Sequence, residues 1–123
     1  MEFRERKSIY LQIADIIIER IINGIWEEEQ RIPSVREMAT EMQVNPNTVV
    51  RSYNYLQSLG IIYNRRGIGY FISFDARKKA LEIKRKEFTR EKLPEIFKEM
   101  TLLKIPIYEF EELYKRYISK DNI

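Results

Sequence analysis

The sequence predicts a mainly α fold with one small β-hairpin, followed by a short helical tail. Apolar residues recur at helical spacing in three segments before residue 60, and two β-prone runs then flank a loop with two glycines. Residues 75–123 contain no glycine and have a helical pattern. We therefore expect two domains, residues 1–74 and residues 75–123, with the boundary near residues 73–75.

The first predicted helix covers residues 8–23 and ends at Asn23-Gly24. Apolar residues three and four positions apart mark its inner face, namely Tyr10, Ile13, Ala14, Ile17 and Ile21. The second helix is about two turns long and begins after Ser34, which forms a predicted capping box with Glu37. Its expected inner residues are Val35, Met38, Ala39 and Met42.

A third helix begins after Asn45, because asparagine is a preferred N-cap and Pro46 suits the first helical position. Its predicted inner residues are Val49, Tyr53 and Leu56, and Gly60 ends it. Residues 61–64 and 70–73 then predict two strands joined by the five-residue loop 65–69. The second and third helices, separated by residues 43–45, make a helix-turn-helix, and the hairpin makes it a winged one.

The polar residues of this unit indicate DNA binding. The outer face of the third helix is predicted to present Asn47, Thr48, Arg51, Asn54 and Tyr55. Asparagine pairs with adenine and arginine with guanine or a phosphate, while Thr48 and the free N–H groups of the first turn suit a phosphate oxygen. Residues 31–66 hold five arginines (31, 36, 51, 65, 66) and two glutamates, although the whole chain carries only +3. Each feature alone has a structural explanation, and the combination is what indicates a DNA-binding face.

Four stretches carry a more specific pattern: residues 9–15 (IYLQIAD), 32–39 (IPSVREMA), 44–49 (VNPNTV) and 65–71 (RRGIGYF). In order and spacing they resemble the GntR family of bacterial transcription regulators. The short helical tail is similar to the YtrA-type subfamily, whose effector domain has only two helices. The resemblance implies a sequence-specific DNA-binding regulator that represses its own operon. The subfamily resemblance implies that this operon includes genes for an ABC transporter.

The resemblance also implies which residues bind double-stranded DNA. They lie at the start of the second helix, at the head of the recognition helix and one turn further on, and at the tip of the wing, where a glycine lets the backbone approach the minor-groove floor. The predicted DNA-binding residues are Arg36, Asn45, Asn47, Thr48, Arg51, Arg65, Arg66 and Gly67.

The chain departs from the family pattern in two places. Glu28-Glu29 stands where the family has Pro-Gly, so the conformation of this loop stays open. In the tail, Lys104 stands where a helix-ending glycine is common, and Pro94 interrupts a segment usually read as one helix. Pro94 is expected to kink or restart that helix.

The tail is expected to form a symmetric homodimer. One helix runs from its N-cap Asp75 to about Leu103, and the last begins near Ile107. Two short helices cannot bury so many apolar residues on each other, so a second copy is expected to cover them. The predicted dimerisation residues are Leu93, Phe97, Met100, Phe110, Tyr114 and Tyr117. A small-molecule effector between protomers, of unknown identity, is an open alternative for the aromatic residues.

The composition excludes several other functions. The chain has no cysteine and no histidine, which excludes disulfide scaffolds, Cys/His metal centres and histidine-dependent triads. No cofactor or metal site is predicted, and an enzyme is disfavoured. The charged residues 1–7 lack a signal-peptide pattern and no apolar stretch is long enough for a membrane span, so we expect a cytoplasmic protein. The remaining alternative is a winged helix that binds another protein.

Overall fold

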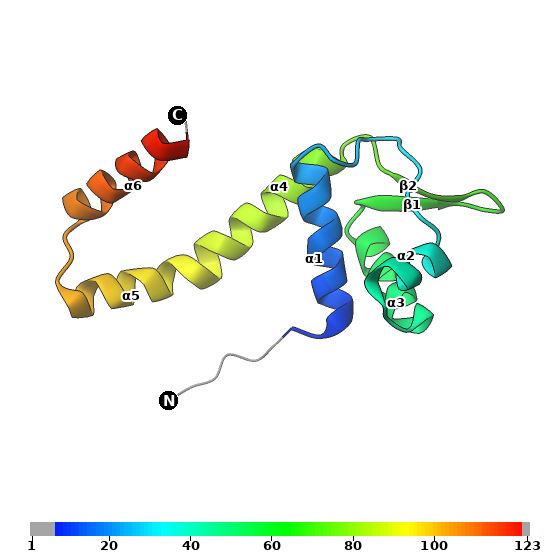
Figure 1. Cartoon of the computed structure of the whole chain (residues 1–123), viewed down its shortest axis with the longest axis horizontal. Helices are drawn as coiled ribbons and strands as arrows, with labels where there is room; N and C mark the ends of the chain where they lie inside the picture. The colour runs from blue at the N-terminus through cyan, green and yellow to red at the C-terminus, as the bar shows by residue number, and fades with distance from the viewer. Residues whose placement is uncertain (1–6, 122–123) are drawn as a thin grey trace. The chain divides into compact units, whose positions relative to one another are not determined.

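The computed structural model describes residues 7–121 and shows a mainly helical chain with one antiparallel β-hairpin (Figure 1). The fold class predicted from the sequence, a winged helix-turn-helix followed by helices, is confirmed. The charged residues 1–6 lie outside the described part. The elements, in order, are α1 (Ile9–Ile22), α2 (Val35–Met42), α3 (Pro46–Ser58), β1 (Ile62–Arg65), β2 (Gly69–Ile72), α4 (Ala76–Glu87), the π-helical η1 (Phe88–Lys92), α5 (Leu93–Leu103) and α6 (Ile107–Asp121).

The chain divides into two compact units between Ile83 and Lys84. Ala76 and Ala80 are fully buried in the core of the first unit, so the beginning of α4 belongs to that unit. The change in composition near residues 73–75 therefore does not coincide with the division of the packed units. Alanine occurs both in cores and on surfaces, so these two residues do not show from the sequence that the first turns of α4 pack against a core.

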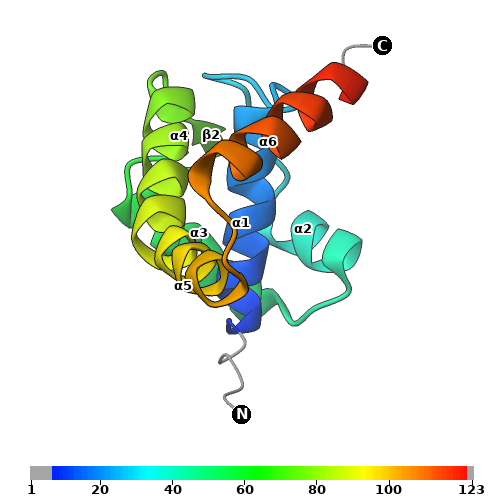
Figure 2. The ribbon, with the colours of Figure 1, turned by 90° about the vertical axis from the view of Figure 1, so that its left-hand side faces the viewer.

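The first unit is built around α3, which lies against both α1 and α2 (Figure 1, Figure 2). The inner residues predicted for α3, Val49, Tyr53 and Leu56, are all fully buried. The Tyr53 hydroxyl donates to the Pro33 carbonyl oxygen at 2.7 Å, which ties α3 to the segment before α2. Burial raises the pKa of Tyr53, so this hydroxyl remains a donor at any ordinary pH.

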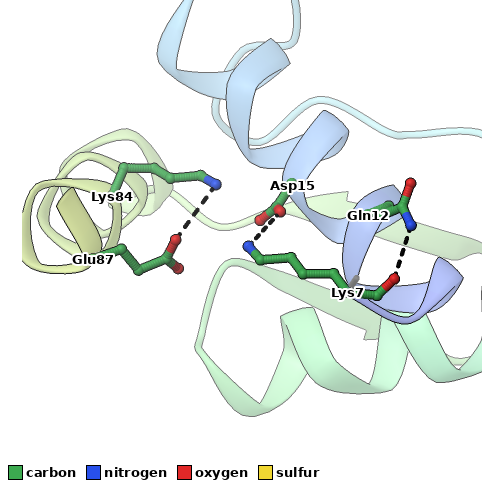
Figure 3. A network of polar contacts seen from close by, with 5 residues as sticks. All are labelled: Lys7, Gln12, Asp15, Lys84 and Glu87. Carbon is green, nitrogen blue, oxygen red and sulfur yellow. Dashed lines mark hydrogen bonds and ion pairs between the residues drawn. The ribbon is translucent and has the colours of Figure 1, made fainter. Parts of the chain in front are cut away.

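The start of α1 is held by polar contacts around Lys7 (Figure 3). Gln12 Nε2 donates to the Lys7 carbonyl oxygen at 2.8 Å, and Lys7 Nζ lies 2.7 Å from Asp15 Oδ2. Exposed ion pairs of this kind contribute at most about 1 kcal/mol, so their main effect is to order the first turn of α1. Figure 3 also draws the ion pair within α4 between Lys84 and Glu87, at 3.8 Å.

The hairpin is tighter than the sequence predicts. Arg65 pairs with Gly69 as the last rung, so the loop contains residues 66–68 rather than 65–69. Segment 29–32 adds to the outer edge of β2: the Glu29 N–H donates to the Ile72 carbonyl, and the Ile32 N–H donates to the Tyr70 carbonyl. This segment supplies partners for edge groups that would otherwise be unpaired, but it has no alternating apolar pattern that would have identified it in the sequence.

The loop whose conformation the sequence left open adopts a left-handed turn. Glu29 has φ +69°, the backbone conformation that a glycine adopts most readily. Glu28 Oε2 accepts the backbone N–H of Arg77 at 3.2 Å, next to the start of α4. The acidic loop therefore keeps a glycine-like turn without a glycine and connects through Glu28 to α4.

The helix expected from Asp75 to Leu103 continues past Pro94, which neither breaks it nor leaves it regular. Residues 88–92 are π-helical, and α5 begins at Leu93 with Pro94 in its first turn. Proline lacks an N–H and its ring clashes with the carbonyl four residues back, so a locally wider turn accommodates it. Lys104 ends α5 with φ +58°, in the left-handed conformation where a glycine is common.

Candidate nucleic-acid interface

The beginning of α2 is fixed by the capping box that the sequence predicts. The Glu37 N–H donates to Ser34 Oγ at 3.1 Å, and the Ser34 N–H donates to Glu37 Oε1 at 2.8 Å. The backbone N–H and then the hydroxyl of Ser34 hold the pKa of the Glu37 carboxyl below its ordinary value. Arg36 lies in this first turn and is exposed, as its predicted role requires.

Asn45 caps α3, and this changes one expectation. Its Oδ1 accepts the Asn47 N–H at 2.7 Å, and its carbonyl oxygen accepts the Thr48 N–H at 2.9 Å. Pro46 has no N–H, so the first turn of α3 does not offer the free N–H groups that we expected to bind a phosphate. The Asn45 side chain and carbonyl accept these N–H groups, because the donors of a helix N-terminus are satisfied locally when a suitable capping residue is present. The cap engages the Asn45 side-chain oxygen and leaves its amide NH₂ for an outside partner.

The outer face of α3 presents most of the predicted side chains. Asn47, Arg51 and Asn54 are exposed, and Thr48 is half-buried. Tyr55 is not a free surface residue, because its ring packs edge to face against Tyr10 of α1 with the centroids 6.3 Å apart. Asn47, Thr48 and Arg51 therefore lie on the amino-terminal half of α3, the part of a recognition helix that reaches base edges.

The wing carries the remaining predicted residues. Arg66, Gly67 and Ile68 form its exposed tip, and Gly67 has φ +78° with no atom within 4 Å of where a Cβ would stand. The Arg65 guanidinium lies over the Phe71 ring, 5.3 Å from its centroid, so this arginine is directed along the hairpin. Arg66 is therefore the tip residue whose charge is most exposed to an outside partner.

Arg31 is one of the five arginines of residues 31–66, but it is not among the predicted DNA-binding residues. Its backbone pairs with Phe71 beside β2, and its side chain lies so close to Gly69 that a Cβ there would be 2.9 Å from Nε. The edge pairing of segment 29–32 thus brings a further exposed arginine to the base of the wing. A lone arginine in an irregular segment gives no sequence signal for this placement.

Both glutamates of residues 31–66 are held by other groups of the fold. Glu37 is occupied by the capping box, and Glu41 Oε2 lies 2.7 Å from an Arg20 guanidinium nitrogen of α1. Among residues 7–121, no group of three or more acidic side chains could hold a metal ion, and no helix has the length and apolar character needed to cross a membrane. The arrangement is an exposed, basic and hydrogen-bonding surface formed by α2, α3 and the wing.

Comparison with known proteins agrees with this geometry. Residues 9–72 match the family described as bacterial regulatory proteins, gntR family. The HTH-type transcriptional regulator YhcF of Bacillus subtilis is 39% identical over 94% of both chains. The HTH-type transcriptional repressor YtrA of the same organism is 40% identical, over 64% of this chain and 61% of its own.

Solved structures extend the likeness to the whole chain. A transcriptional regulator of the GntR family from Bacteroides thetaiotaomicron is 45% identical, with a TM-score of 0.80 over 93% of this chain and 99% of its own. YtrA from Sulfolobus acidocaldarius, a GntR-family transcription factor, covers this chain completely at 26% identity and a TM-score of 0.53. This chain is therefore a DNA-binding transcriptional regulator that belongs to the GntR family, in its YtrA-like group.

Proposed function

We propose that this chain is a repressor that binds a pseudo-palindromic operator as a homodimer. The observation that carries the proposal is the surface of α3 and the wing, which exposes Asn47, Arg51 and Arg66, while Glu37 caps α2 and Glu41 pairs with Arg20. Two further findings support it. A related repressor, YtrA, is 40% identical to this chain, and the DNA-binding domain of AraR, 25% identical over 59% of this chain, is known in complex with an operator.

Each group of residues has a distinct part in the proposed complex. Asn47 suits an adenine edge and Arg51 a guanine edge or a phosphate, because both extend from the half of α3 that enters the major groove. Thr48 and Arg36 suit the flanking phosphates. Arg66 and Gly67 suit the minor groove, and Arg65 supports them at the base of the tip. Asn45 acts mainly by capping the helix that presents the others.

The helical tail supports the dimeric part of the proposal. Phe97, Phe110, Tyr114 and Tyr117 are all exposed in the single chain, and neither α5 nor the described part of α6 contains a buried residue. So many exposed large apolar side chains on two short helices are what a partner subunit covers. Two recognition helices related by a two-fold axis would read half-sites about one helical turn apart.

The most informative experiment compares Arg66→Ala with Arg85→Ala on a duplex that the wild-type protein selects from a random library. Both variants lose one exposed positive charge, but Arg85 lies in α4 and outside the proposed surface. We expect Arg66→Ala to bind more weakly and to lower the slope of log Kd against log salt by about one, whereas Arg85→Ala leaves that slope unchanged.

Two results would contradict the proposal. Equal binding to every duplex would show that the chain does not read sequence. No DNA binding at all, with capture of another protein that is lost in Asn47→Ala and Arg51→Ala, would favour a protein-interaction module instead.

A further inference from the structure

Tyr10, in the first turn of α1, contacts an arginine of the recognition helix. The guanidinium carbon of Arg51 lies 4.1 Å from the centroid of the Tyr10 ring. A cation within roughly 6 Å of a ring centroid, over its face, is attracted to the ring. Within residues 7–121 Arg51 forms no ion pair, so the charge of a nearby carboxylate does not orient this side chain.

Tyr10 is held at its backbone and at its ring by the helix that carries Arg51. The hydroxyl of Ser52, which is fully buried, donates to the Tyr10 carbonyl oxygen at 2.8 Å. The Tyr55 ring packs edge to face against the Tyr10 ring, with an interplanar angle of 84°. Ser52 and Tyr55 follow Arg51 by one and four positions on α3, so they anchor the tyrosine next to the arginine that it contacts.

A guanidinium held by its face keeps its N–H donors available along its edges. A side chain that is already held in place also loses less conformational entropy when it binds, and an unrestrained arginine has much to lose. We propose that Tyr10 is a positioning residue for DNA binding, whose ring holds the Arg51 guanidinium ready for a guanine edge or a phosphate. The inference rests on the proposed function, because it takes Arg51 as a DNA contact.

The test is a double-mutant cycle on the duplex selected by the wild-type protein. Tyr10→Leu is expected to weaken binding about 2- to 5-fold, the effect of one exposed cation–π contact. Tyr10→Phe keeps the ring and is expected to bind as the wild type does. In an Arg51→Ala background, Tyr10→Leu is expected to have no further effect on affinity, because the arginine that the ring positions is gone.

A loss of the same size in both backgrounds would mean that Tyr10 supports only the fold, and it would overturn the inference. So would a Tyr10→Phe variant that binds as weakly as Tyr10→Leu. An Arg51→Ala variant with full affinity overturns the inference but leaves the regulator in place, whereas a wild-type protein that selects no duplex overturns the proposed function as well.

A second readout uses the free protein. The ring current of Tyr10 is expected to shift the Arg51 side-chain proton resonances, and the shift should persist in Tyr10→Phe and vanish in Tyr10→Leu. Its absence from the wild-type spectrum would contradict the stacking itself, whatever the DNA experiment shows.

Discussion

Glu29, Gln43 and Lys104 occupy the left-handed backbone region, with φ of +69°, +56° and +58°. A side chain in this region costs free energy because its Cβ crowds the following carbonyl oxygen. Gln43 ends α2 in the turn before the recognition helix, and Lys104 ends α5. At these three positions the rest of the fold stabilises a left-handed turn by more than its cost to a residue with a side chain.

Glu29→Gly is expected to raise the free energy of unfolding by about 0.5 to 1 kcal/mol, because relief of the left-handed strain exceeds both the extra entropy of an unfolded glycine and the loss of the long, exposed hydrogen bond that the Tyr63 hydroxyl donates to Glu29 Oε1 at 3.5 Å. Glu28→Gly is the matched control. It removes an acceptor of the Arg77 N–H from a neighbouring residue without a positive φ, so it is expected to lower stability. Urea unfolding of all three proteins at one protein concentration measures both changes. Equal destabilisation by both glycines would contradict the argument.

Residue-level reasoning from the sequence identified the exposed groups of α3 but not what restrains them. Tyr10 shows the difference: it was predicted as an inner residue of its helix, and its ring contacts Arg51. Helical periodicity assigns a residue to a face, but the atoms that meet that face come from elsewhere in the chain.

At the scale of elements, α2 depends on its capping box more than on its length. Eight residues are too few for a helix to be stable alone, so the cap and the packing of Met38 and Ala39 hold it in place. This matters for DNA binding because Arg36 lies within the capped turn.

The capping box predicts a pH dependence of stability. The pKa of Glu37 in the folded protein is below the ordinary value of 4.5, so its carboxylate contributes stability that is fully present above the unfolded-state pKa and is lost as the pH falls through the folded-state pKa. The wild type is therefore expected to be more stable than Glu37→Gln at neutral pH, with the difference closing in acid. Urea unfolding from neutral to acid pH measures this difference in stability, and a difference independent of pH would contradict the prediction.

Ser34→Ala, which removes the other half of the capping box, is expected to lower the free energy of unfolding by about 1 kcal/mol at neutral pH.

The elements that the sequence predicts well are those whose signals are local. The Ser34 box, the Asn45-Pro46 start and the glycines of the wing each act within a few residues, and the structure shows all three. Segment 29–32 and the π-helical turn before Pro94 were not predicted, because one depends on the edge of a distant strand and the other on how a helix accommodates a proline in its path.

At the scale of the whole molecule, the exposed apolar residues of α5 and α6 are the main feature left without a partner in one chain. Leu102, Ile107 and Tyr108 are each at least 68% exposed. Nothing in a single copy of residues 84–121 buries them, which is the physical reason for proposing a second copy.

Phe97→Glu is expected to weaken the proposed dimer about 30-fold or more, because it places a charge where an aromatic anchor would be buried. Lys98→Gln changes the charge by the same amount at the adjacent exposed position and is expected to leave the dimer intact. Sedimentation equilibrium measures the association, and far-UV circular dichroism checks that the helices persist. A wild-type protein that stays monomeric at all accessible concentrations would contradict the proposal.

The sequence by itself determined the order and type of the elements, the helix caps and the family resemblance, because capping, periodicity and motif spacing depend on neighbouring residues. Only the tertiary structure decided which of those residues are free to act. It showed that Arg31 lies at the base of the wing, that Tyr10 contacts Arg51, and that α4 begins inside the first unit. These outcomes depend on contacts between segments far apart in the chain, and such contacts are formed by packing rather than by local pattern.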